Sequence, residues 1–197
     1  MERKQISCRR KTNDSRGLPD NAQALVADYR GDFADLIRDA DFDVIMNTNE
    51  TFVLFDMVPR STMEATGSQN VDIRPSQGNP KLGCTVTLVV TTDGRKGRAE
   101  LNFRGLAPDG DVIRQLQADA PDNVRVTGSP QGWARHQSLI EWLQALIVPF
   151  VAGATFLLLL DRYPAHRNQQ FRDAITAENG TDTFIPGRCT SLLQPLD

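Results

Sequence analysis

The stretch "TFLLLLDRYPAH", Thr155 to His166, decides the fold. Five apolar residues in a row are followed directly by an aspartate. A short continuous apolar run is typical of a strand that is buried on both faces of a sheet. A charge at the end of such a strand is either buried at high cost or lies at the edge of the sheet, where open α/β sheets hold their functional groups. Asp161 is therefore a candidate site residue, although a purely structural role for a lone aspartate remains equally open.

The same strand closes a longer apolar run, "ALIVPFVAGATFLLLL" from Ala145 to Leu160. The run falls just short of the roughly 20 residues that a membrane-spanning helix needs. Pro149 and Gly153 interrupt it. The pattern therefore predicts a helix end, a turn and a buried strand, and no membrane segment.

The segments on either side alternate between helical and strand patterns. Region 106–135 is polar and gives no clear pattern. The order of elements predicts an α/β fold with a mixed sheet and flanking helices. The expected elements are a helix over 18–39, a strand from Phe42 that continues or turns back near Thr51, a short strand over 71–74, a hairpin of 84–91 and 99–104, a helix capped by Ser138, a helix ended by Gly180 and a short strand over 181–187.

Composition favours one ordinary globular domain of 197 residues. The start carries no secretory signal, which predicts an intracellular protein, and the three cysteines show no metal or disulfide spacing. The net charge of -3 argues against a chain that binds nucleic acid over its whole surface. Only the start is locally basic, with Arg9, Arg10 and Lys11. These residues are either a solvated tail, which their spacing alone favours, or contacts to phosphates.

Several motifs, in order, resemble the DDE superfamily of transposase endonucleases in its pogo/Tigger/jerky branch. "ISCRRKTNDSRGLP" at 6–19 is similar to the linker of that family, and "MNTNETFVLFDM" at 46–57 to its "N-x-D-E-T-x-x-x-F-D-M" strand. "LLLLDRYPAH" is similar to "L-L-L-D-N-x-x-x-H", with Arg162 in place of the asparagine. "CTSLLQPLD" at 189–197 is similar to "T-T-S-x-x-Q-P-L-D" and is the most specific match.

The resemblance implies an RNase H-like mixed sheet in which three carboxylates hold two Mg²⁺ or Mn²⁺ ions for attack on a DNA phosphodiester. Hard ions prefer carboxylate oxygens, and two of them stabilise both the attacking and the leaving oxygen. By motif, Asp161 is the second carboxylate and Asp197 the third. His166 either supports the site or pairs with backbone at a helix start. The resemblance also implies a DNA partner and a nuclear location, and it is compatible with a homodimer that needs no small-molecule cofactor.

The first carboxylate position departs from the motif, because Asn49 stands where the family has an aspartate. An amide offers one neutral oxygen and cannot bridge two cations as a carboxylate does. Glu50 is a poor substitute, because successive residues of a strand face opposite sides. Asp43 shares the face of Asn49 but lies roughly 20 Å away along the strand. Metal binding and catalysis are therefore expected to be weak.

The domain organisation that follows is a basic tail and linker helix over 1–40 and an RNase H-like DDE endonuclease domain over 41–197, truncated at its C-terminal end. Asp197 is the last residue, where the chain is expected to fray. We therefore expect a transposase-derived endonuclease domain that is catalytically impaired. The alternative is a domesticated or decayed module that binds nucleic acid or protein without catalysis.

Overall fold

The computed structural model describes residues 6–10, 18–55, 61–65, 83–130 and 136–196. The side chains of β1, β3 and His136 are outside this description, as are Lys11, the strand expected over 71–74 and Asp197. The elements are β1 (Ile6–Arg10), α1 (Ala22–Asp39), β2 (Val44–Leu54), β3 (Ser61–Ala65), β4 (Gly83–Thr91), β5 (Ala99–Arg104), α2 (Asp111–Asp119), β6 (Val124–Ser129), α3 (His136–Trp142), the π-helical turn η1 (Leu143–Ile147), α4 (Val148–Val151), β7 (Phe156–Leu160), α5 (Gln169–Ala177), β8 (Gly180–Phe184) and α6 (Thr190–Leu193).

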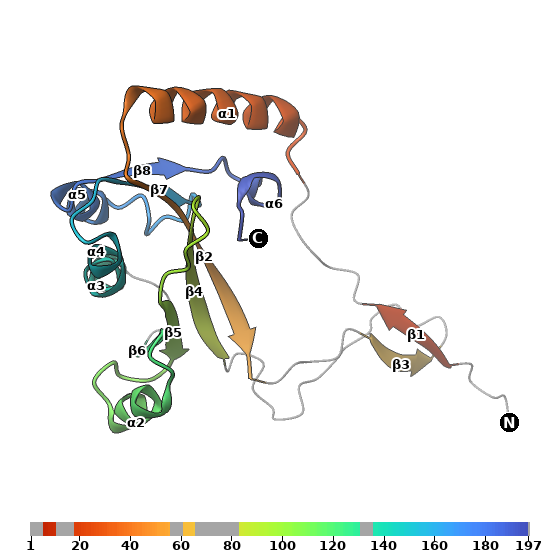
Figure 1. Cartoon of the computed structure of the whole chain (residues 1–197). Coiled ribbons are helices and arrows are strands. Elements are labelled where there is room, and N and C mark those ends of the chain that lie inside the picture. The colour runs from red at the N-terminus through yellow and green to blue at the C-terminus, as the bar shows by residue number, and fades with distance from the viewer. Residues whose placement is uncertain (1–5, 11–17, 56–60, 66–82, 131–135, 197) are drawn as a thin grey trace, which may run out of the picture.

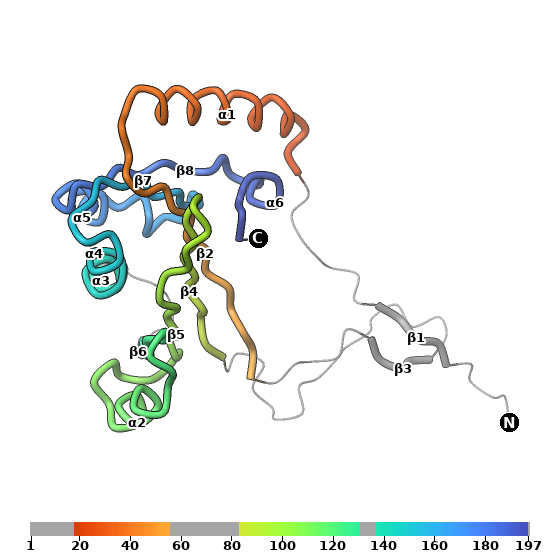
Figure 2. The backbone as a smooth tube through the Cα atoms, viewed as in Figure 1, coloured from red at the N-terminus to blue at the C-terminus, as the bar shows by residue number. Residues whose placement is uncertain are grey.

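A six-stranded mixed sheet, in the order β6-β5-β4-β2-β7-β8, organises the molecule, and β1 pairs with β3 in a separate ribbon. β2, β4 and β5 are antiparallel neighbours, whereas β7 runs parallel to both β2 and β8. β7 lies beside β2 although a long stretch of chain separates them (Figure 2). The expected mixed sheet and the hairpin of 84–91 and 99–104 are confirmed.

All five residues of β7 are buried, as the apolar run predicted. The even-numbered residues pack against the helices of one face: Phe156, Leu158 and Leu160 share a core with residues of α3, η1 and α5. Figure 1 shows α3, α4 and α5 on this side of the sheet and α1 and α6 on the other. Trp142 is 3% exposed and belongs to this core.

The helical segment over 136–151 begins before the expected cap and contains an irregular turn, whereas the helix end, turn and strand expected after it are confirmed. α3 begins at His136, so Ser138 lies inside the helix and is not its cap. A π-helical turn precedes Pro149, and the amide of Val148 donates to the carbonyl of Leu143, five residues back. A proline lacks an amide hydrogen and crowds the preceding turn, which is a known cause of such local irregularity.

Gly180 does not end the preceding helix, as the sequence suggested; α5 ends at Ala177, and Gly180 is the first residue of β8. The ring of Phe156 and the side chain of Ile175 lie where a β-carbon at this position would project. The glycine is therefore needed for close packing between β8 and β7. Region 106–135, which gave no pattern, contains α2 and β6.

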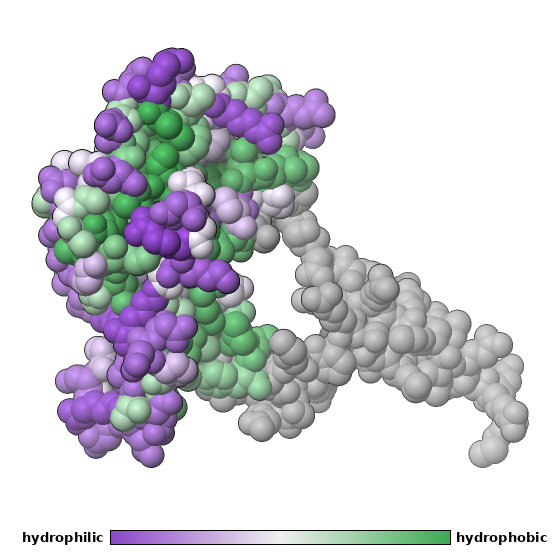
Figure 3. Space-filling model, in the orientation of Figure 1, coloured by the Kyte–Doolittle hydropathy of each residue, from purple (hydrophilic) through white to green (hydrophobic). Residues whose placement is uncertain are grey.

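Among the described residues, no helix has both the length and the apolar character that crossing a bilayer requires. Exposed apolar side chains gather where β2 and β4 extend away from the helices, and Figure 3 shows the apolar area there. They include Val53, Phe55 and Leu88.

Candidate active site

The register between β2 and β7 brings the two motif strands together. Asn47 pairs with Leu159 in parallel register, and its Nδ2 donates to the Leu159 carbonyl at 3.2 Å. Asn49 and Asp161 each follow two residues later on their own chain segments. The parallel register therefore puts Asp161, which follows the carboxyl end of β7, at the level of Asn49 in the middle of β2.

Asp161 follows β7 immediately and is fixed by the loop that comes after it. Its Oδ1 accepts from the backbone amide of Tyr163 at 3.1 Å and lies 2.6 Å from His166 Nδ1. A turn over 164–167 returns the histidine toward the strand end. The side chain of Asp161 is 38% exposed, so the carboxylate remains open to solvent on one side.

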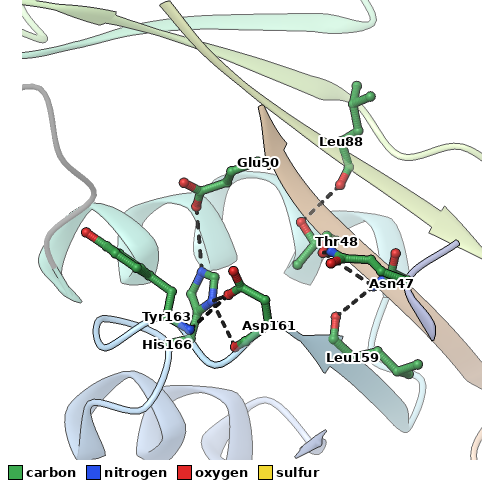
Figure 4. A network of polar contacts seen from close by, with 9 residues as sticks. Asn47, Thr48, Glu50, Leu88, Leu159, Asp161, Tyr163 and His166 are labelled. Carbon is green, nitrogen blue, oxygen red and sulfur yellow. Dashed lines mark hydrogen bonds and ion pairs between the residues drawn. The ribbon is translucent and has the colours of Figure 1, made fainter. Parts of the chain in front are cut away.

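His166 is the centre of this group. It is 6% exposed and lies between Asp161 and Glu50, whose Oε1 is 3.6 Å from His166 Nε2 (Figure 4). The rings of Tyr163 and Phe171 pack against the imidazole, with centroids 5.6 Å and 6.3 Å away. The histidine therefore joins a carboxylate from β2 to a carboxylate at the end of β7.

The charges of these groups stabilise one another. Burial disfavours the imidazolium, but the hydrogen bonds and charges of Asp161 and Glu50 outweigh it and raise the pKa of His166 to about 9. Burial alone would raise the pKa of Asp161, because it disfavours the charged carboxylate. The hydrogen bond and charge of His166, together with the Tyr163 amide, nevertheless lower the pKa of Asp161 below its ordinary value. At neutral pH the group is an imidazolium flanked by two carboxylates.

Asn49 takes part in a different contact. Its Nδ2 donates to the carbonyl oxygen of Leu196 at 3.1 Å. Gln194, which is 8% exposed, adds a second tie, because its Nε2 donates to the carbonyl of Thr48 at 3.0 Å. The segment after α6 is thus fastened to the middle of β2. Asp197 lies outside the described residues, and the structure places its neighbour Leu196 against Asn49.

Asn49 and Glu50 lie on opposite faces of β2, because successive residues of a strand alternate. Asn49 contacts Leu196, whereas Glu50 contacts His166. Glu50 nevertheless reaches the Asp161 group, because the 162–168 loop carries His166 to the face that Glu50 occupies. The sequence predicted that Glu50 faces away from Asn49, as it does, but not that His166 would connect Glu50 to Asp161. Asp43 is at the amino end of β7, where its Oδ2 accepts from the amide of Thr155 at 2.9 Å.

A second carboxylate on the helix-covered face was also missed. Glu100, on β5, is 5% exposed and forms an ion pair with Arg125 on β6. Burial raises the pKa of Glu100, and the Arg125 guanidinium opposes the rise only in part. Pairing of Glu50 with Thr87, and of Thr87 with Glu100, puts both glutamates on one face. The hairpin pattern could have revealed this register.

The described residues do not fit a two-metal centre. No group of three or more His, Cys, Asp or Glu side chains that could hold a metal ion occurs within 6–10, 18–55, 61–65, 83–130 and 136–196. Asp161 supplies one carboxylate, and its Oδ1 is engaged by His166. Arg9 and Arg10 lie in β1, whose side chains are not described, and Lys11 lies outside the described residues.

Comparisons with known proteins agree with the order of motifs along the chain. The model of the DDE superfamily endonuclease family matches residues 101–197, which include Asp161 and Asp197. The "Pogo transposable element with KRAB domain" proteins of Homo sapiens and Mus musculus are 26% and 25% identical over the whole chain. The chain spans only 32% of the length of each of these relatives.

One solved structure supports the assignment of the fold. The crystal structure of the Mos1 mariner paired-end complex with Mn superposes with a TM-score of 0.51 at 12% identity. The match covers 89% of this chain and 46% of the Mos1 chain. At this identity the likeness concerns the fold alone, and it identifies the mixed sheet with its flanking helices as RNase H-like.

Proposed function

We propose that the chain is a transposase-derived member of the DDE superfamily of endonucleases that acts on DNA and whose phosphodiester chemistry is impaired. One observation carries the proposal. At the first carboxylate position of the motif, the structure has an amide whose Nδ2 already donates to the Leu196 carbonyl at 3.1 Å. An aspartate could not make this contact, because a carboxylate has no hydrogen to donate.

The charge that is missing at residue 49 matters for cation binding. A pair of unit charges 4 Å apart contributes on the order of 4 kcal/mol at an effective dielectric constant of 20, and each 1.4 kcal/mol is about a factor of ten. A divalent ion at this rim would have the carboxylate of Asp161 as a ligand, together with that of Asp197 when the last residue reaches the site. We therefore propose that Mg²⁺ or Mn²⁺ binds weakly and that cleavage is inefficient.

DNA binding without efficient cleavage is the function we assign to the domain. Arg162 and Arg167 are exposed on the loop that follows Asp161, and the basic residues Arg9, Arg10 and Lys11 lie near the start of the chain. Lysine and arginine side chains bind phosphates in a salt-dependent way that does not require a metal. These basic residues also favour the second candidate, a non-catalytic nucleic-acid-binding module, for which the resemblance to transposases suggests a nuclear location.

A nicking assay separates impaired catalysis from full activity. Supercoiled plasmid is incubated with the full chain and Mg²⁺ or Mn²⁺, and we expect no conversion to open circles. Cleavage that disappears in Asp161→Ala would show that the site is active and would overturn the proposed impairment.

A binding assay tests the DNA role. We expect duplex binding to weaken with salt, and the salt slope to fall by about 2 when Arg162 and Arg167 are both changed to alanine. The matched control changes two exposed arginines of other elements, Arg30 on α1 and Arg114 on α2, and alters the net charge equally. Equal losses in the two double variants would contradict a specific role for the loop.

A further inference from the structure

A small pocket lies behind Glu50, between the sheet and α3. The cavity has a volume of about 20 Å³. Its walls include Glu50 of β2, Thr87 of β4, Glu100 and Asn102 of β5, and Trp142 of α3. It shares Glu50 with the Asp161 group, and it is far too small for a nucleotide or any other organic substrate.

Two polar atoms of the cavity walls lack a hydrogen-bond partner. The Oδ1 of Asn102 and the Nε1 of Trp142 are both buried, and neither has a partner within the described part of the chain. An unsatisfied buried polar group costs about 1 to 3 kcal/mol. One atom is an acceptor and the other a donor, so they are complementary to a single small molecule that can both accept and donate.

The carboxylates in the walls already have cationic partners. Glu100 pairs with Arg125, and Glu50 lies against His166. Arg125 balances the charge of Glu100, whereas Glu50 shares the single charge of His166 with Asp161, so one negative charge remains on that group of three side chains. The unsatisfied groups are a neutral donor and a neutral acceptor.

We propose that the cavity is a binding site for one buried water molecule, which accepts a hydrogen bond from Trp142 Nε1 and donates one to Asn102 Oδ1. A water needs about 10 to 15 Å³ and two to four polar partners, and the cavity offers both. The water can donate its second hydrogen to a side-chain oxygen of another lining residue, such as Glu50 or Thr87. The water would then support the strand segment that presents Glu50 to His166. This proposal does not depend on the proposed function.

Nuclear magnetic resonance can detect the water directly. The chain has two tryptophans, so a Trp133→Phe variant leaves the indole Nε1 hydrogen of Trp142 as a single signal. We expect a cross-peak between this hydrogen and a long-lived water. No such cross-peak in the folded protein would overturn the proposal.

Two variants test the acceptor. Asn102→Leu removes Oδ1 at similar volume, and we expect the water cross-peak of Trp142 to disappear while its indole signal remains. Thr127→Val is the matched control, since Thr127 pairs with Asn102 in the sheet and does not line the cavity. A cross-peak that survives in Asn102→Leu would overturn the assigned acceptor, as would its loss in both variants. If Asn102→Leu does not fold, a high-resolution crystal structure decides: a water between the two atoms supports the proposal, and an empty cavity or a cation bound by the carboxylates overturns it.

Discussion

The side-chain amide of Asn49 donates to the carbonyl oxygen of Leu196 across 3.1 Å, which ties the middle of β2 to the segment after α6. The family motif has an aspartate at residue 49. A carboxylate there would face a carbonyl oxygen with no hydrogen between them. The asparagine therefore removes a charge and also adds a structural hydrogen bond, so restoring the aspartate has two opposing effects.

Asn49→Asp is expected to destabilise the protein when no divalent ion is present. The variant loses the hydrogen bond to Leu196 and places two acceptors together, which costs about 1 to 3 kcal/mol. Adding Mg²⁺ or Mn²⁺ should then raise its melting temperature more than that of the unchanged protein. Thermal unfolding with and without each ion measures both effects.

Asn49→Ala is the control for this experiment, because it loses the same hydrogen bond without gaining a charge. We expect it to be destabilised in buffer and to respond to divalent ions no more than the unchanged protein does. If Asn49→Asp and Asn49→Ala respond alike, the rim does not assemble a cation site.

The stability that His166 contributes should depend on pH. The pKa of His166 is raised to about 9 in the folded chain, against about 6.5 in an unfolded one. The contribution is therefore complete below about pH 6.5 and is lost as the pH rises through 9. Its size is on the order of 3 kcal/mol, taken from the shift alone.

His166→Gln is the variant for this measurement, because glutamine can donate to Asp161 but carries no charge. We expect the difference in unfolding free energy between the two proteins to be largest near pH 6 and to shrink toward pH 9.5. Denaturant titrations without divalent ions give the difference at each pH. A difference that does not change with pH would show that His166 is not charged in the folded protein.

The two carboxylates should contribute unequally to the pKa of His166. Asp161 Oδ1 is 2.6 Å from Nδ1, whereas Glu50 Oε1 is 3.6 Å from Nε2. Both Asp161→Asn and Glu50→Gln should lower the pKa of the histidine, the first more than the second. The chain has only two histidines, so His136→Gln isolates the signal of His166 for a titration by nuclear magnetic resonance. The reverse order would contradict the geometry.

Much of the sheet could be predicted because its strands carry strong local patterns. The apolar run of 156–160 predicted a buried strand, and the strand patterns of 84–91 and 99–104 predicted the hairpin of β4 and β5. Asp161 could be placed at the rim, because a charged residue that directly follows a buried strand lies at the edge of the sheet. Each of these features is determined by residues that are close to one another in the sequence.

What the sequence did not reveal depends on contacts between distant segments. His166 reaches Glu50 through the path of a loop, and the ion pair of Glu100 with Arg125 depends on the pairing of β5 with β6. β6 itself was missed, because its alternation covers only the four residues from Val124 to Thr127 before Gly128 and lies within an otherwise polar region. Gly180 was wrongly predicted to end a helix. Its actual role depends on the ring of Phe156, which is distant in the sequence and packs against it only in the folded sheet.

Gly180 offers a direct test of that packing. A β-carbon at residue 180 would collide with the ring of Phe156 and with Ile175, all of which are buried. Gly180→Ala should therefore destabilise the protein by about 1 to 3 kcal/mol, as overpacked cores do. Gly187→Ala is the matched control, since a β-carbon there meets nothing within 4 Å. It should be neutral or slightly stabilising, because alanine restricts the unfolded chain. Urea midpoints of the two variants measure the contrast, and equal midpoints would mean that β8 can move away from β7 at no cost.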